Sequence, residues 1–222
     1  MAEKTALLLG ASGLVGGFCL DFLLAEPGYD KVVVLVRRPL QKNHPKLEQH
    51  IINFDQPETY QSFLHAEDVY SCLGTTVLKS PNRSDYFKID FSYPFEIAKI
   101  AKENGTKQFS FVSALSANPK SWFFYSRVKG KFETAIIELG FESIQMFRPS
   151  YLVGERIEFR PIEKIGVFIL KCLSPFMRGG LKKFRPIEAK AVAYAMVKKS
   201  IEHAPGVHIW FGDQMQEIWD KR

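Results

Sequence analysis

Cysteine is scarce in this sequence. Cys19, Cys72 and Cys172 are the only three among 222 residues, and they lie far apart. An odd number of widely spaced cysteines argues against a disulfide framework and against a zinc site, and it is typical of a reducing compartment. The five histidines are scattered as well, so no metal site is expected.

Long apolar runs and linker-like segments are also missing. No apolar run reaches the ~18 residues that a membrane span needs, and the first expected strand begins too early to leave room for a signal peptide. No Pro/Gly/Ser-rich stretch, internal repeat or low-complexity tract divides the chain. Because 222 residues with 46% hydrophobic residues suffice for one core, we expect a single cytoplasmic domain over residues 1–222, without a transmembrane segment.

The chain carries a net charge of +6, from 30 lysines and arginines against 24 aspartates and glutamates. Such an excess suits nucleic acid, a membrane surface or an anionic cofactor. Basic residues gather in Arg178, Lys182, Lys183 and Arg185, yet no helix-turn-helix, zinc or RNA-binding motif accompanies them. We therefore expect no nucleic-acid partner and interpret this cluster as solvated surface.

Strand-like and helix-like segments alternate along the chain. Near-continuous runs of valine, leucine and isoleucine, separated by helical patterns, are typical of a parallel sheet covered on both faces. The predicted fold class is therefore α/β, a Rossmann-like doubly wound parallel sheet with a small C-terminal helical substrate or lid region over 155–205. Ligands of such sheets bind beyond the carboxyl ends of the strands. The expected strands are Ala6–Leu9, Lys31–Val36, a third strand that ends over Ile51–Phe54, Asp68–Leu73, Gln108–Val112 and Ser143–Phe147, and the expected helices begin at Leu14 and cover Pro94–Glu103 and Trp122–Leu139.

A glycine-rich turn follows the first expected strand. Gly10, Gly13 and Gly16 lie between that strand and a helical pattern, an arrangement that directs free backbone N–H groups and a helix N-terminus at a pyrophosphate. Gly10 allows the tight turn, Gly13 lets the backbone approach the phosphates, and Gly16 lets helix and strand pack closely. The turn predicts a dinucleotide site.

The end of the second strand indicates which dinucleotide binds. NAD sites usually carry Asp or Glu about 20 residues after the glycines, where the carboxylate binds the ribose 2′-hydroxyl. Here Val36 occupies that place, and Arg37 and Arg38 follow it. A guanidinium suits a 2′-phosphate through charged, forked hydrogen bonds, and Ser12 can donate to the same phosphate. NADP(H) is therefore predicted, with NAD(H) as the alternative.

Catalytic chemistry is expected after the fifth strand. Ser113 closes that strand, and Tyr125 and Lys129 lie one turn apart on the helix that follows. A lysine ammonium beside a phenol lowers a pKa that starts near ~10, which makes the tyrosine a usable proton donor to a carbonyl oxygen. Tyr194 and Lys198 repeat the spacing without a strand-end serine, so we interpret that second pair as ordinary helix packing.

Four segments together resemble one family: GASGLVG from Gly10, SCLGTT from Ser71, VSALSANPKSWFFYSRVKGKFE from Val112 and MFRPSYLVG from Met146. They are similar to atypical short-chain dehydrogenase/reductases, and specifically to the small NADPH-binding Tat-interacting-protein family and its epimerase-like bacterial relatives. The resemblance covers nearly the whole chain. It implies a cofactor site with Gly10, Ser12, Gly13, Leu14 and Val15 at the pyrophosphate, Arg37 at the adenosine phosphate, Asp55 at the adenine, Leu73, Gly74 and Thr75 at the ribose, and Arg148, Pro149, Ser150, Leu152 and Val153 at the nicotinamide, beside Tyr125 and Lys129.

Two features differ from the family pattern. The serine motif, usually Ser-Ser, is Ser113-Ala114-Leu115-Ser116 here, so Ser116 is an alternative to Ser113. The part after Arg148 is also short, which leaves little protein to hold a nucleotide sugar. Epimerase chemistry is therefore disfavoured relative to a reductase.

The function predicted first is NADPH-dependent reduction of a small-molecule carbonyl compound. In it, Tyr125 donates the proton, Lys129 lowers the pKa of Tyr125, and Ser113 binds the oxyanion. The alternative is a redox sensor or regulator that keeps the dinucleotide site and acts by binding another protein; a homodimer is also compatible with the sequence.

The apolar segment 162–177 is interpreted as a lid packed on the core, with a pocket wall, a dimer face and a membrane-surface patch as alternatives.

Overall fold

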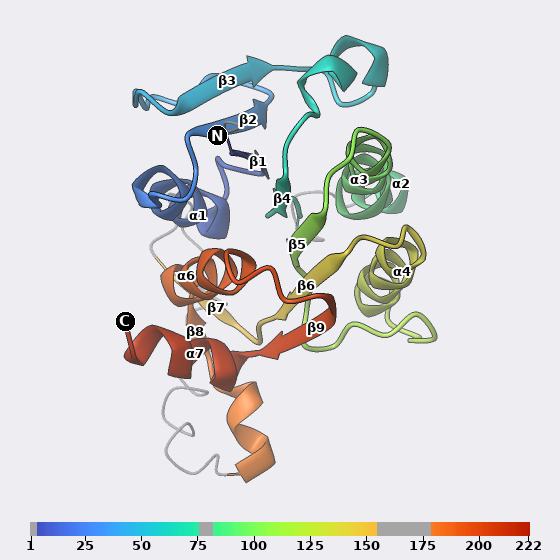
Figure 1. Cartoon of the computed structure of the whole chain (residues 1–222). Helices are drawn as coiled ribbons and strands as arrows, with labels where there is room; N and C mark the ends of the chain where they lie inside the picture. The colour runs from blue at the N-terminus through green and yellow to red at the C-terminus, as the bar shows by residue number, and fades with distance from the viewer. Residues whose placement is uncertain (1–3, 76–81, 155–178) are drawn as a thin grey trace.

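A seven-stranded parallel sheet forms the centre of the molecule (Figure 1). The computed structural model describes residues 4–75, 82–154 and 179–222. The strand order is β3-β2-β1-β4-β5-β6-β9, and each neighbouring pair is parallel. The predicted α/β class with a doubly wound parallel sheet is therefore confirmed. The strands are β1 Thr5–Leu9, β2 Lys31–Val36, β3 Leu47–Ile51, β4 Asp68–Ser71, β5 Gln108–Val112, β6 Ser143–Arg148 and β9 Gly206–Phe211.

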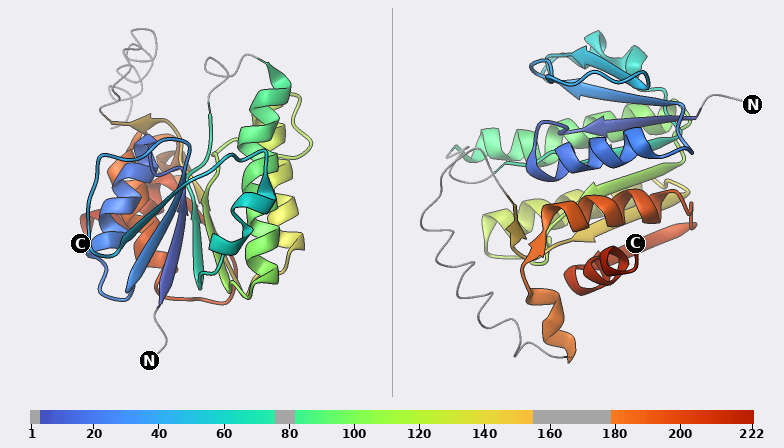
Figure 2. Two further views of the ribbon diagram at one scale, coloured as in Figure 1. Left: turned by 90° about the horizontal axis from the view of Figure 1, so that it is seen from above. Right: turned by 90° about the vertical axis from the view of Figure 1, so that its left-hand side faces the viewer.

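Helices cover both faces of this sheet (Figure 2). Side chains alternate along each strand, so Ala6 and Leu8 enter one core with α1 and α6, whereas Leu7 and Leu9 enter a second core with α3 and α4. β1 pairs with both β2 and β4, so the strand order reverses beside β1, where open α/β sheets bind ligands. The helices are α1 Leu14–Ala25, α2 Arg83–Phe87, α3 Tyr93–Glu103, α4 Phe124–Glu138, α6 Ala189–Ser200 and α7 Gly212–Asp220, and short 3₁₀ turns occupy η1 Pro57–Thr59, η2 Gln61–Phe63 and η5 Gly179–Phe184.

The two edge strands differ most from the prediction. β3 begins at Leu47 and ends at Ile51, which is the first residue of the segment that was expected to close this strand. Its sequence LEQHI is only partly buried, so it lacks the continuous apolar run that marks the inner strands. β9 was not predicted. As an edge strand it leaves Val207 and Ile209 exposed, and its short mixed pattern resembles a loop.

Helix α6 belongs to the core, although the sequence placed it in the lid region. It packs beside α1, and its alanine-rich face is completely buried. The ring of Tyr194 contacts Phe22 of α1 and Trp219 of α7, with ring centroids 5.4 and 5.5 Å apart. Tyr194 is therefore a packing residue, as predicted.

The segment between this helix and β6 is only partly described. β7 Leu152–Val153 and β8 Ile187–Glu188 form a two-stranded parallel sheet. The apolar segment 162–177 lies outside the described residues. Across 4–75, 82–154 and 179–222, no helix is both long and apolar enough to cross a membrane.

Adjacent glycines of α1 provide a matched test of its close packing. A Cβ on Gly16 would lie 2.0 Å from the Gly10 carbonyl oxygen, whereas a Cβ on Gly17 would meet only Ala11 O at 3.7 Å. Gly16→Ala should therefore lower the free energy of unfolding by about 3 kcal/mol through overpacking. Gly17→Ala should be neutral or should raise it by up to about 1 kcal/mol, because alanine favours helix. Urea unfolding of both variants measures the difference, and equal effects would contradict this account of the turn.

Candidate functional site

The glycine turn leaves the first backbone N–H groups of α1 without side-chain partners. Gly10 has a φ of +79°, which glycine adopts without strain, and Gly13 N–H donates to Gly10 O at 2.9 Å. Gly13 is the N-cap of α1, and no side chain caps the helix there. Uncapped N–H groups at a helix N-terminus are a binding site for an anion.

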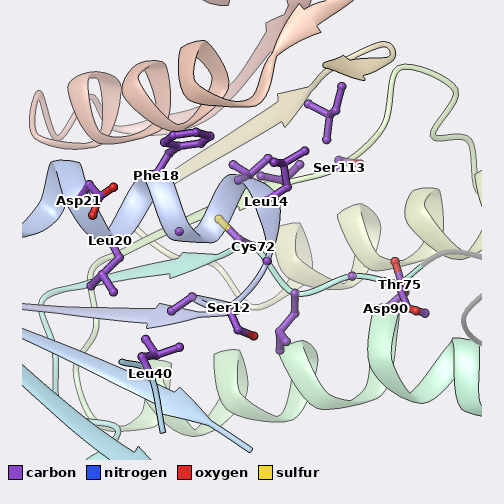
Figure 3. Close-up of a pocket in the computed structure, with 18 of the residues that line it drawn as sticks. Ser12, Leu14, Phe18, Leu20, Asp21, Leu40, Cys72, Thr75, Asp90 and Ser113 are labelled. Atoms are coloured by element: carbon purple, nitrogen blue, oxygen red, sulfur yellow. The ribbon is translucent and has the colours of Figure 1, made fainter. Parts of the chain in front are cut away.

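A cavity of about 710 Å³ opens at this turn, beyond the carboxyl ends of β1, β4 and β5 (Figure 3). Its size is in the range of ligand pockets. Its walls include the following residues that the sequence assigned to the site: Ser12, Gly13, Leu14, Val15, Leu73, Gly74, Thr75, Ser113, Tyr125, Lys129 and Leu152. They also include others that were not assigned: Ala11, Gly17, Phe18, Leu20, Asp21, Leu40, Gln41, Lys42, Cys72, Asp90 and Val112.

A second cavity of about 400 Å³ lies beyond the ends of β2 and β3 and is lined by Arg37 and Asp55. Asp55 accepts hydrogen bonds from Tyr93 Oη at 2.9 Å and Lys88 Nζ at 3.2 Å. These two bonds lower the pKa of Asp55, so the carboxylate is charged at neutral pH. Arg37 is exposed and makes no ion pair with any residue in the described part of the chain.

The remaining assigned residues line neither cavity. They are Gly10, Arg38, Arg148, Pro149, Ser150 and Val153. Arg148 is held by Glu133 of α4, with Nε–Oε1 and Nη2–Oε2 distances of 2.8 and 2.5 Å. The Ser150 hydroxyl donates to the carbonyl of Arg185. Both side chains are therefore engaged in bonds that join β6 and its extension to other elements.

Of the two candidate catalytic serines, Ser113 and not Ser116 borders the main cavity. It is 4% exposed, and its hydroxyl has no hydrogen-bond partner in the described part of the chain. Ser116, the alternative, accepts a hydrogen bond from Ser126 Oγ at 2.9 Å and does not line the cavity. A buried hydroxyl without a protein partner is costly, so Ser113 is poised to bond a ligand.

Lys129 is balanced by a carboxylate that sequence reasoning missed. Asp90 is 1% exposed and Lys129 is 6% exposed, and Lys129 Nζ lies 2.8 Å from Asp90 Oδ1. The backbone N–H of Thr75 donates to Asp90 Oδ2 at 2.7 Å. Burial lowers the pKa of Lys129, but Asp90, together with Tyr125 and Glu133, outweighs burial and the net shift is upward, so the ammonium stays charged.

A π-helical turn carries Asp90 to this position. α2, the π turn η3 Lys88–Ser92 and α3 form one continuous helix, in which Tyr93 N–H donates to Lys88 O. The prediction of a helix that starts near Pro94 was too short, because Pro94 lies inside it. Proline has no N–H for the carbonyl four residues earlier, which is that of Asp90. The π turn accommodates this gap, and the Asp90–Pro94 spacing was the available sequence signal.

The pKa of Tyr125 moves in the opposite direction from the prediction. Tyr125 is 36% exposed and lines the cavity. Burial is the largest cause and raises its pKa, Lys129 lowers it by less than burial raises it, and Asp90 adds a smaller upward contribution. Burial of the phenol therefore outweighs the expected effect of the lysine.

The loop between β5 and α4 is fixed against the helix that carries Tyr125. Asn118 N–H donates to Ser126 O at 3.0 Å. A Cβ on Gly130 would lie 2.2 Å from Pro119 N and 2.3 Å from Asn118 C. Only glycine at this position lets the loop lie this close to α4.

The parallel sheet, the uncapped glycine turn and the cavity at the strand reversal define a Rossmann-type dinucleotide-binding domain. The NAD dependent epimerase/dehydratase family matches residues 6–121, more than half of the 222 residues. The chain belongs to this family.

Curated relatives support this assignment. Protein HTATIP2 of Rattus norvegicus is 33% identical over 167 residues, which cover 73% of this chain and 69% of the relative. Protein FMP52, mitochondrial, of Coccidioides immitis is 30% identical over 215 residues, which cover 91% and 87%. The match to HTATIP2 agrees with the family resemblance seen in the sequence.

Solved structures share the fold at low identity. The Bordetella bronchiseptica enzyme WbmH in complex with NAD+ has a TM-score of 0.72 at 16% identity, covering 98% of this chain and 80% of that one. MoeE5 in complex with UDP-glucose and NAD has a TM-score of 0.70 at 15% identity, covering 93% and 75%.

The cytoplasmic location expected from the sequence is contradicted by the relatives' names. FMP52 of Coccidioides immitis, Candida albicans and Candida glabrata is in each case called mitochondrial. The cysteine count indicates a reducing environment, but it does not distinguish one compartment from another.

The buried ion pair gives a stability test. Asp90→Ala leaves the Lys129 ammonium buried without its counter-charge, so the free energy of unfolding should fall by about 3–5 kcal/mol. Adding Lys129→Met to that variant removes the unpaired charge and should recover most of the loss. Urea unfolding of the two single variants and the double variant measures the coupling. Additive losses would show that the two side chains do not depend on each other.

Proposed function

We propose that this chain binds NADP(H) and reduces a small carbonyl compound at the cavity beside the glycine turn. The observation that carries the proposal is the buried, unpartnered hydroxyl of Ser113 in the same cavity wall as Tyr125 and Lys129. A hydroxyl, a phenol and an ammonium around one space supply the donors that a carbonyl oxygen needs as it gains negative charge.

The residues present fit a nicotinamide dinucleotide. The uncapped N-terminus of α1 and the turn at Ser12 and Gly13 suit the pyrophosphate. Lys129 lines the same cavity, and its ammonium is suited to the nicotinamide ribose. When bound, the reduced cofactor supplies a hydride to the carbonyl carbon.

The protein's own contribution is to hold the carbonyl oxygen and to give it a proton. Tyr125 donates its phenolic proton to that oxygen, and Ser113 donates a second hydrogen bond. Because the pKa of Tyr125 is raised, the phenol keeps its proton at neutral pH and is ready to act as an acid. Lys129, kept charged by Asp90, stabilises the phenolate that remains.

The preference for NADP(H) rests on Arg37. It follows β2, it has no carboxylate partner among residues 4–75, 82–154 and 179–222, and it lines the cavity that also contains Asp55. A forked guanidinium suits the 2′-phosphate of the adenosine, and no carboxylate follows β2 to bind a 2′-hydroxyl.

Tyr125→Phe tests the proton donor. The variant keeps the ring and loses the hydroxyl, so NADPH oxidation with a panel of carbonyl compounds should fall by about 10²–10⁴-fold. The dissociation constant for NADPH, measured by calorimetry, should change little. Unchanged turnover in this variant would contradict the mechanism.

The same assay separates the reductase from other activities. Epimerisation of a nucleotide sugar leaves the total amount of reduced cofactor unchanged, so substrate conversion without NADPH consumption would favour an epimerase. Cofactor binding without conversion of any compound would instead favour the sensor or regulator.

Arg37→Glu tests the cofactor preference, and Arg38→Glu is its matched control because Arg38 lines neither cavity. Arg37→Glu should weaken NADPH at least about tenfold more than NADH, which corresponds to about 1.4 kcal/mol. Arg38→Glu should affect both cofactors to a similar, smaller extent. Equal losses of NADPH and NADH in Arg37→Glu would contradict the 2′-phosphate assignment.

A further inference from the structure

Cys72 lies in the wall of the cavity and Cys19 lies in the core behind it, and the proposed reaction uses neither thiol. Cys72 directly follows β4, is half-buried and lines the main cavity, where its sulfur is visible in Figure 3. Cys19 lies in α1 and is completely buried. The third cysteine, Cys172, is outside the described residues.

The Cys72 side chain packs against the core cluster that contains Cys19. The thiol of Cys19 is within hydrogen-bonding reach of Cys72, and this bond together with burial raises the pKa of Cys19. Cys19 therefore remains a neutral thiol, and Cys72 is the one that solvent and small molecules can reach through the cavity.

The close packing at the glycine turn explains why these thiols meet. A Cβ on Gly10 would lie 2.6 Å from the Cys72 carbonyl carbon, so the turn lies directly against the end of β4. Gly16, which lies equally close to the turn, is three residues before Cys19 and thus shares its helix face. The contacts that position the turn therefore also bring Cys19 to Cys72.

We propose that Cys19 and Cys72 form an oxidation site for a hydroperoxide. The sulfur of Cys72 attacks one peroxide oxygen, the O–O bond breaks, and a sulfenic acid forms at Cys72 while water (or an alcohol) leaves. The sulfur of Cys19 then attacks the Cys72 sulfur and displaces a water molecule. Two thiols are oxidised to one disulfide, and one peroxide is reduced.

This site is coupled to the cavity's occupant, a step that rests on the proposed function. Cys72 is reached from the cavity whose lining includes Gly13 and Leu73. A dinucleotide bound there covers the thiol, so only the free protein reacts with peroxide. The disulfide in turn ties α1 to the segment that follows β4, the two elements between which the cofactor would lie.

The test uses full-length protein with Cys172→Ser, so that only the two thiols of interest remain. Treatment with hydrogen peroxide should remove two hydrogen atoms from the intact mass, and peptide mapping should find Cys19 linked to Cys72. In Cys19→Ser the same treatment should instead leave Cys72 as a sulfenic acid, trapped by dimedone. In Cys72→Ser the buried Cys19 should react little.

Three results would overturn the oxidation site: both thiols remaining free, Cys72 proceeding to sulfinic acid equally fast with and without Cys19, or Cys19 reacting equally fast without Cys72. The coupling is tested with NADPH at a hundred times its dissociation constant, where oxidation should slow by up to about 100-fold. If calorimetry shows binding but the rate is unchanged, the coupling is wrong. If calorimetry shows no binding, the proposed function fails, while the peptide map still decides the oxidation site.

Discussion

The ion pair between Lys129 and Asp90 is the constraint on which the site depends. Both groups are almost completely removed from water, where a single charge is far more costly than a pair. The pair joins α4 to the π turn, and the bond from Thr75 N–H to Asp90 adds the segment after β4. Three segments distant in the sequence thus meet at one carboxylate, which determines where the ammonium lies and what charge Tyr125 experiences.

The glycine turn imposes the second constraint, which is steric. Gly10 and Gly16 lie so close to backbone atoms that any side chain there would displace the turn. This proximity fixes the turn and α1 against the end of β4, and with them one part of the cavity wall. The electrostatic and steric constraints meet at residues 72–75, which contact the turn on one side and Asp90 on the other.

Local patterns were sufficient for the inner part of the fold. The runs at β1 and β2 are apolar on both faces, so their burial in a parallel sheet could be predicted from the residues alone. The edge strand β3 could not, since three of the five residues in its sequence LEQHI are polar and none of the five is buried. Among the site residues, Ser113, Tyr125 and Lys129 share one cavity as their spacing indicated.

What sequence reasoning missed depends on partners that are remote in the chain. The bond from Arg148 to Glu133 of α4 is one such contact that the sequence did not indicate. Asp90 escaped notice because its burial arises from a helix irregularity and from packing against α4. The direction of the Tyr125 pKa shift was missed because burial of the phenol outweighs the lowering by Lys129. That burial arises from tertiary packing, which the spacing of two residues does not contain.

The contact at Gly130 has an evolutionary consequence. Gly130 follows Lys129 directly, and because it has no side chain, residues 118 and 119 can lie on the helix surface. A relative with alanine there must carry a longer or differently bent connection between β5 and α4, and that connection begins at Ser113. Insertions in this loop should therefore occur together with loss of the glycine, so that the loop and position 130 change together as the family diverges.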